Sequence, residues 1–260
     1  MTLIFNAITN GALLPSNSLN LKETQLVRCL TYISRKYFSH GRTLVISSPS
    51  NYRDVQQELI AEIQRISTWP IVVTLDGNIG PHEESYFIDK DGSYIMLIPD
   101  GHIKNLQAEF NGLAFERTKF TRLWDSEARF VVAGDKEFSM SKQTEIFNIL
   151  SKFRIYNCII VCREHYCIGN GYRRTKNVKN VDRFMKLGVH TWFPYQSSNR
   201  CTEVNDITLL DSWVISAQGH FTKNTDLFPR KISNNLNGCP MKAFVHNAKW
   251  HFTTNYVNAI

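Results

Sequence analysis

The stretch TLVISSPSNYRDVQQELIAEIQRISTWPIVVTL, Thr43 to Leu75, carries the pattern that decides the fold. Short apolar runs at 43–47 and 71–75 flank a segment whose apolar side chains recur at helical spacing, and Trp69-Pro70 ends that helix. A strand, a helix and a second strand in this order predict a βαβ unit with two parallel strands in one sheet. The helix carries Val55, Leu59, Ile63 and Ile66, and we expect Asn51 to cap it, with Asp54 in its first turn.

The same alternation continues on both sides of this unit. It predicts further helices over 20–38, 101–117 and 139–153, and further strands over 128–134, 154–161 and 189–195. Asp91-Gly92, between two β-like runs, predicts a hairpin. We therefore expect an α/β domain over 20–215, an open and mainly parallel sheet with helices on both faces.

The remaining segments read differently from this domain. Residues 1–19 include a short apolar stretch without a basic start, which makes a weak signal peptide. Residues 216–240 have the composition of a linker or junction, and we expect 241–260 to be the truncated start of a new unit, with its first strand at 241–245. No apolar run approaches the length of a transmembrane helix.

The net charge of +7 is concentrated in one segment. Residues 172–186 hold six basic side chains against Asp182, so they contribute 6 − 1 = +5. We interpret this segment as an exposed basic loop, either simply solvated or able to contact phosphate groups.

No residue pattern in the chain is typical of catalysis, metal binding or a cofactor. Walker A, G-x-G-x-x-G and G-x-S-x-G motifs are absent, and His82 and His165 each stand beside glutamates that we expect on a solvated surface. The sequence CIIVCREHYC, residues 158–167, offers zinc-ligand types, but its first cysteines lie in an apolar run that a strand would bury. We therefore predict no enzyme activity, no metal and no cofactor.

Loops that follow the predicted strands are candidates for a ligand site, because ligands of open α/β sheets bind at the carboxyl ends of strands. The loop residues that we expect to line such a cleft are Ser48, Asn51, Asp76, Asn78 and Asp135. A separate aromatic cluster, Trp192, Phe193 and Tyr195, either closes the core or forms a contact surface.

The stretch LFPRKISNNLNGCPMKAFV, Leu227 to Val245, resembles a motif of insect ionotropic receptors, the chemosensory relatives of ionotropic glutamate receptors. The upstream stretch from Trp192 to Trp213 is similar to the end of the amino-terminal region in divergent termite and cockroach receptors. The matching positions of the junction motif are Phe228, Pro229, Lys231, Asn235, Leu236, Gly238, Cys239, Pro240 and Lys242.

The resemblance implies an extracellular, non-enzymatic amino-terminal module of a ligand-gated cation channel, cut before the pore, with a lobe like that of periplasmic binding proteins. It implies other receptor subunits or a co-receptor as partners, and a small-molecule ligand. The extracellular setting implies a disulfide between Cys201 and Cys239, with two unpaired thiols as the alternative. The second hypothesis is a cytosolic module that uses 172–186 to bind an acidic partner or nucleic acid, and an α/β enzyme is a third.

Overall fold

The computed structural model describes residues 19–66, 69–75, 92–99, 127–164, 186–195 and 203–231, with residues 4–5 and single positions 103, 106, 107, 110, 111, 125, 201 and 239. One nine-stranded sheet runs through them in the order β1-β3-β2-β4-β5-β6-β7-β8-β9. The strands are β1 (Ile4–Phe5), β2 (Leu44–Ser48), β3 (Ile71–Leu75), β4 (Ser93–Leu97), β5 (Arg129–Glu137), β6 (Cys158–Arg163), β7 (Lys186–Thr191), β8 (Thr208–Val214) and β9 (His220–Phe221). The described helices are α1 (Leu21–Tyr37), α2 (Arg53–Ile66) and α4 (Met140–Lys152), with a 3-10 turn η1 (Ser50–Tyr52) before α2.

The centre of the sheet is parallel. Strands β3, β2, β4, β5 and β6 lie side by side and all run the same way. The chain winds outward in both directions from β2, so the order of these strands switches between β2 and β4. The predicted α/β class is confirmed, with antiparallel strands added at both edges.

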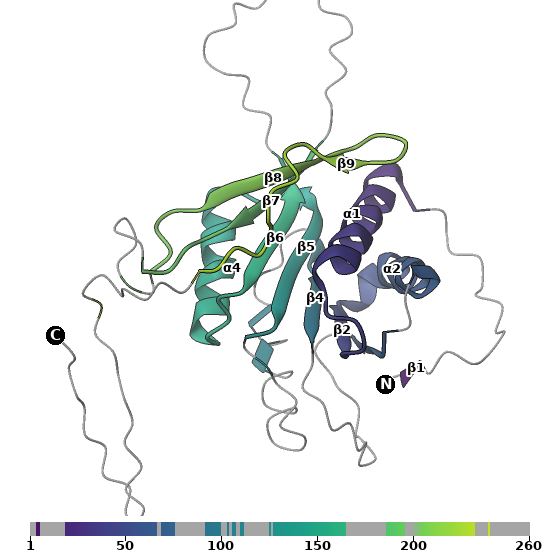
Figure 1. Cartoon of the computed structure of the whole chain (residues 1–260), viewed down its shortest axis with the longest axis horizontal. Helices are drawn as coiled ribbons and strands as arrows, with labels where there is room; N and C mark the ends of the chain where they lie inside the picture. Colours follow the sequence, from purple (N-terminus) through teal and green to yellow (C-terminus); the bar gives the residue numbers. More distant parts are fainter. Residues whose placement is uncertain are drawn as a thin grey trace, which may run out of the picture.

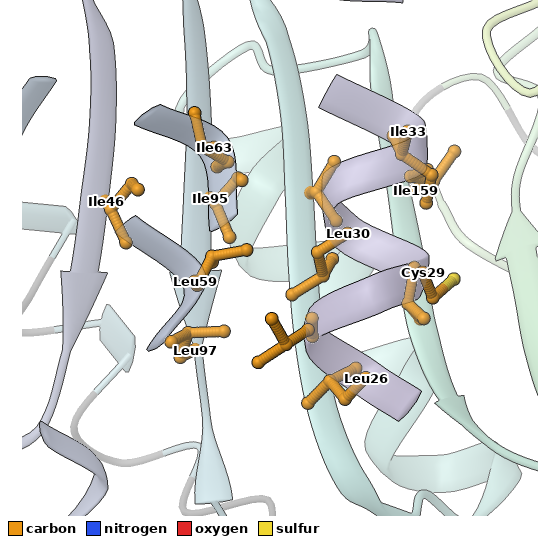
Figure 2. Packing of buried hydrophobic residues seen from close by; sticks show 14 of the residues in the cluster. Leu26, Cys29, Leu30, Ile33, Ile46, Leu59, Ile63, Ile95, Leu97 and Ile159 are labelled. Carbon is orange, nitrogen blue, oxygen red and sulfur yellow. The ribbon is translucent and has the colours of Figure 1, made fainter. Parts of the chain in front are cut away.

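Helices α1 and α2 cover one face of this sheet (Figure 1). Asn20 begins α1 with a capping box: its side chain accepts from the backbone of Lys22 and Glu23, and the Glu23 side chain accepts from the Asn20 backbone N–H. The apolar stripe of α1 then packs toward the strands, beside that of α2 (Figure 2). This layer includes Leu26, Leu30 and Ile33 of α1, Leu59 and Ile63 of α2, and Ile46, Ile95 and Ile159 of the sheet.

The other face carries a second core. Alternate residues of each central strand belong to opposite layers, so Val131 packs with α1 and α2 whereas Val132 packs with α4. The helical residues Ile103, Leu106 and Phe110 also belong to the second layer. Burial on both faces is the reason that the central strands read as continuous apolar runs rather than as alternating ones.

Residues 216–231, the continuous described part of the predicted junction, pack against the domain. Strand β9 pairs with β8, and Leu227 and Phe228 are buried in the first core layer. The Tyr37 hydroxyl donates to the carbonyl oxygen of Thr225 and accepts from the Leu227 N–H, which fixes this segment at the end of α1.

Several details differ from the sequence predictions, among them the strand predicted at 154–161, which spans Cys158–Arg163. Both edges of β4 are taken by parallel neighbours, β2 and β5, so the strand after Asp91-Gly92 cannot form the predicted hairpin. Asn51 lies inside η1 rather than at the cap of α2. The strand predicted at 189–195 spans Lys186–Thr191, because Trp192 and the residues after it turn away from the ladder.

The aromatic cluster after β7 closes the core at one of its positions. Trp192 is fully buried in the second layer, near the rings of Phe147 and Tyr156, whereas Phe193 and Tyr195 are partly exposed. Within the described ranges, no helix combines the length and apolar character that a membrane span requires.

Candidate functional site

Three of the residues predicted to line a cleft lie near one another at the carboxyl ends of the parallel strands. Ser48 ends β2, Asn51 lies in the turn after it, and Asp135 lies near the end of β5. Ser48 is fully buried and Asp135 is 6% exposed, whereas Asn51 is exposed. Asp76 and Asn78 lie outside the described residues, and the lining of a cleft by this set stays a prediction.

Tyr52, which the sequence did not single out, lies in the turn η1 after β2 and interacts with Asp135 of β5. Burial and the negative charge of Asp135 raise the pKa of the Tyr52 hydroxyl above its ordinary value. The Ser48 hydroxyl has no hydrogen-bond partner among the described residues. The carboxyl ends of these strands therefore carry three buried polar side chains, Ser48, Tyr52 and Asp135.

A pocket of about 620 Å³ opens at the opposite, amino ends of the parallel strands, where β5 and β6 begin. Two loops form one side, the turn before β5 and the turn between α4 and β6. The other side is a tetrapeptide from the predicted junction, Phe228 to Lys231. The described lining residues are Glu127, Arg154, Tyr156, Asn157, Phe228, Pro229, Arg230 and Lys231.

Lys231 is the buried cation of this pocket. It is 8% exposed, and its ammonium donates a hydrogen bond of 2.6 Å to the carbonyl oxygen of Cys158. Burial lowers the pKa of Lys231 from its ordinary value. In the described part of the chain no carboxylate pairs with this ammonium, so two of its three N–H donors remain available.

Arg154 stands at the rim of the pocket with a strained backbone. Its φ is 59°, in the left-handed region, one residue past the helix cap Phe153. The N–H of Arg154 bonds to the Ser151 carbonyl and that of Ile155 to the Leu150 carbonyl, which is the Schellman pattern. Glycine is the favoured residue at this position, so arginine here costs stability, and a function of its side chain would account for its presence.

Asp211 holds the junction segment against the domain. Its buried carboxylate accepts from the backbone N–H groups of Ser212, Lys223 and Thr225 and from the Thr222 hydroxyl. Burial on its own would raise the pKa of Asp211, but these hydrogen bonds outweigh it and hold the pKa below the usual range. The carboxylate thereby fixes the course of the chain that leads to Lys231.

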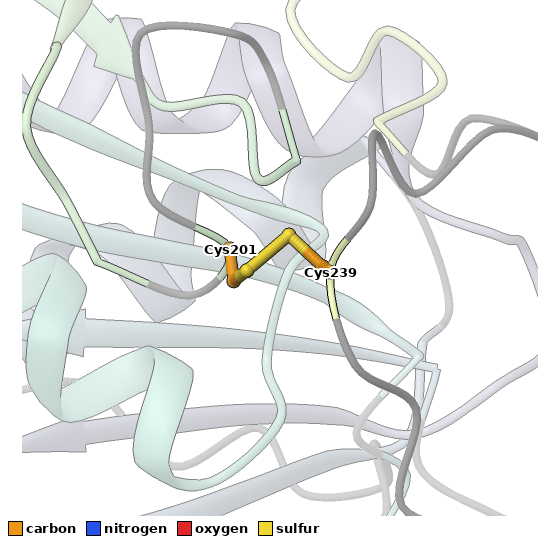
Figure 3. The surroundings of a disulfide bond; sticks show 2 residues. All are labelled: Cys201 and Cys239. Carbon is orange, nitrogen blue, oxygen red and sulfur yellow. A yellow bond between two sulfur atoms is a disulfide. The ribbon is translucent and has the colours of Figure 1, made fainter. Parts of the chain in front are cut away.

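The disulfide implied by the family resemblance is present. Cys201 and Cys239 are bonded, with Cα atoms 5.4 Å apart, and Figure 3 shows the bridge between the two chain segments. The bond closes a loop that includes β8, β9 and the pocket residues 228–231. The bond thus ties a point eight residues after Lys231 to Cys201.

The thiol and imidazole that approach each other on β6 and β7 do not form a nucleophilic pair. Cys162 Sγ lies 3.8 Å from His190 Nδ1. Burial raises the pKa of Cys162 to about 12 and lowers that of His190, so both groups stay neutral near pH 7. Cys158 and Cys162 are both buried in the second core layer, and no cluster of metal-ligating side chains occurs among the described residues.

Several predicted residues lie outside the described part of the chain. They include most of the basic loop 172–186, His82, His165, Cys167, the strand expected at 241–245, and the motif positions Asn235, Leu236, Gly238, Pro240 and Lys242. Of the junction motif, the structure brings Phe228, Pro229 and Lys231 to the pocket and Cys239 to the disulfide. Sequence reasoning missed Arg154 and Arg230, since nothing in their neighbourhood distinguishes them from surface arginines.

Neither a protein-family model nor a curated protein matches this chain.

Proposed function

We propose that this chain is a non-enzymatic binding module made in the secretory pathway, the amino-terminal region of a chemosensory ionotropic receptor. In this proposal the doubly wound sheet is a lobe like that of periplasmic binding proteins, on the extracellular side of the plasma membrane. Its partners are other receptor subunits or a co-receptor, and its ligand is a small molecule. The resemblance of the junction motif to insect ionotropic receptors provides the family.

The Cys201–Cys239 bond is the observation that carries the proposal. Structural disulfides persist in oxidising compartments and are rare in the cytosol. This bond joins the junction motif to the domain, at a point where the motif residues Phe228 and Lys231 are already buried. A receptor that passes a signal across this junction needs such a fixed connection.

Thiol counting on protein secreted by eukaryotic cells tests the compartment. The chain has six cysteines, so the bond leaves 6 − 2 = 4 thiols that react with iodoacetamide after denaturation without reductant. Mass spectrometry of a non-reduced digest should show the peptides of Cys201 and Cys239 as one linked species. Six reactive thiols would instead favour the cytosolic hypothesis based on 172–186.

Sequencing the transcript past the codon of Ile260 tests the receptor assignment itself. The proposal expects the two segments of a ligand-binding core with three apolar spans between and after them. A transcript that encodes none of these would contradict the receptor role, whatever the state of the cysteines.

A further inference from the structure

We propose that the pocket between β5, β6 and the junction tetrapeptide binds a small organic carboxylate. The positively charged side chains of its lining would bind the carboxylate group. The inference rests on the proposed role as a binding module and names the class of ligand. This pocket lies at the amino ends of the parallel strands, whereas the sequence predicted a cleft at their carboxyl ends.

The first argument is the unbalanced charge of Lys231. A buried ammonium is costly unless an anion and hydrogen-bond acceptors compensate it. Its acceptor among the described residues is the neutral Cys158 carbonyl, at 2.6 Å. A ligand carboxylate that reaches Lys231 would supply both the missing charge and the missing acceptors.

The second argument is the charge of the rim. Arg154 and Arg230 are exposed and flank the pocket, and Glu127 is the one carboxylate among the described lining residues. The described lining therefore carries 3 − 1 = +2 with Lys231 protonated. Guanidinium groups match the planar fork of a carboxylate, and two of them at the entrance favour an anion over a neutral ligand.

The third argument is the strain at Arg154. An arginine occupies the left-handed position of a Schellman motif, where glycine would be more stable. The pocket gives its side chain a role that glycine cannot fill. Strain of this kind is typical of functional sites, where binding compensates for lost stability.

The size and walls of the pocket indicate that the ligand has an organic body. A volume of about 620 Å³ lies in the range of small-molecule sites and is far larger than a bare inorganic anion needs. Tyr156, Phe228 and Pro229 provide apolar surface beside the cations. An aromatic or aliphatic carboxylate uses both kinds of lining, whereas inorganic phosphate uses the cations alone.

Titration of the oxidised full-length chain with phenylacetate tests the proposal. We expect saturable binding by calorimetry and a rise in Tm that grows with concentration. 2-Phenylethylamine, which has the same ring and the opposite charge, should give neither. The Lys231→Met variant should bind phenylacetate about tenfold more weakly or worse, since a charge-assisted contact is lost.

Lys223→Met is the matched control, because Lys223 is an exposed lysine of the same segment and is not among the lining residues. It should bind phenylacetate like the unmodified chain. If Lys231→Met does not fold, Arg230→Met, at an exposed position, should weaken binding several-fold instead.

Absence of phenylacetate binding at millimolar concentration would overturn the proposal, as would equal binding by the Lys231 and Arg230 variants. Inorganic phosphate that binds as tightly as phenylacetate would overturn the assignment of an organic ligand. Disulfide mapping on the same sample separates the two proposals. An intact disulfide without phenylacetate binding contradicts only this inference. Phenylacetate binding to a chain whose cysteines are all reduced contradicts only the secretory role.

Discussion

The ammonium of Lys231 donates to the carbonyl oxygen of Cys158, a residue 73 positions earlier in the chain. This contact joins the junction segment to the start of β6, at the edge where the parallel strands begin. It also leaves a buried cation without an anionic partner among the described residues. The stability of the domain should therefore depend on this one side chain.

Replacing Lys231 with methionine should stabilise the domain in the absence of ligand. Methionine keeps much of the side-chain volume and removes the buried charge, a change worth about 1–4 kcal/mol in the free energy of unfolding. Because the folded pKa of Lys231 is lowered, the unfolded chain binds its proton more tightly. The stability of the unmodified chain should thus rise as pH goes from the folded pKa toward the ordinary value of 10.5, and the variant should lack this rise.

Urea unfolding between pH 7 and pH 10.5 measures this effect. Lys223→Met serves as the control and should show no gain, because Lys223 is exposed. A Lys231→Met chain less stable than the unmodified one at pH 7 would mean that the Cys158 hydrogen bond outweighs the cost of burying the charge.

Arg154→Gly should raise stability by about 1 kcal/mol, because glycine adopts the left-handed φ of 59° without steric cost. For a domain of this size, that gain corresponds to about 2–4 °C in Tm. Arg154→Ala removes the same side chain but keeps the strain, so its Tm should not rise. Calorimetry on both variants separates the backbone effect from the loss of the side chain, and equal Tm values would contradict the strain.

Breaking the disulfide should loosen the junction segment. The bond closes a loop of 38 residues, for which chain entropy predicts about 4 kcal/mol of stabilisation. The double variant Cys201→Ser with Cys239→Ser should unfold at a lower urea concentration, and amide exchange should increase between 216 and 231. Dithiothreitol should lower the Tm of the unmodified chain and leave the double variant unchanged.

Asp211 should make the domain sensitive to acid. Since the folded pKa of this carboxyl lies below its unfolded value, the stability that it contributes is present above about pH 4 and is lost as pH falls through the folded pKa. Asp211→Asn should cost about 2–3 kcal/mol at neutral pH, because the amide keeps one acceptor oxygen and its NH2 group cannot accept from the donors that face it. Acid titration of both chains should show their stabilities converging below pH 4; a constant difference would contradict the ionised role.

Gly219 occupies a turn that tolerates no side chain. Its φ is +69°, and a Cβ there would overlap the Trp213 ring. Gly219→Ala should destabilise the domain by about 2–4 kcal/mol, through backbone strain and the clash together. Gly41→Ala separates the two causes, because Gly41 has a φ of +80° with open space around it, and should cost only about 1 kcal/mol. Thermal melts that show equal losses would indicate that Trp213 moves aside.

Local patterns predicted the central elements well. The helix predicted at 20–38 was observed at Leu21–Tyr37, and the helix predicted at 139–153 was observed at Met140–Lys152 with Ser139 as its cap. The β2-α2-β3 unit lies where the opening stretch placed it. Hydrophobic period and capping are properties of neighbouring residues, so the sequence displays them directly.

Such local patterns did not predict the strand pairing around β4, the packing of the junction segment or the pocket. The polar stretch from 216 has the composition of a linker, yet it is bound to the domain. Asp211 and Tyr37 form hydrogen bonds with it, and Cys201 forms a disulfide with Cys239. The hairpin signal at Asp91-Gly92 failed because two strands from elsewhere in the chain occupy both edges of β4.

The sequence by itself determined the alternation of strands and helices, the two-sided burial of the central strands, and the resemblance on which the receptor proposal depends. Only the tertiary structure decided that Arg154, Arg230 and Lys231 share one pocket and that Lys231 is buried in it. The physical reason is the range of the interactions. Helix and strand formation depends on residues a few positions apart, whereas a pocket and the desolvation of a charge depend on which distant segments the folded chain brings into contact.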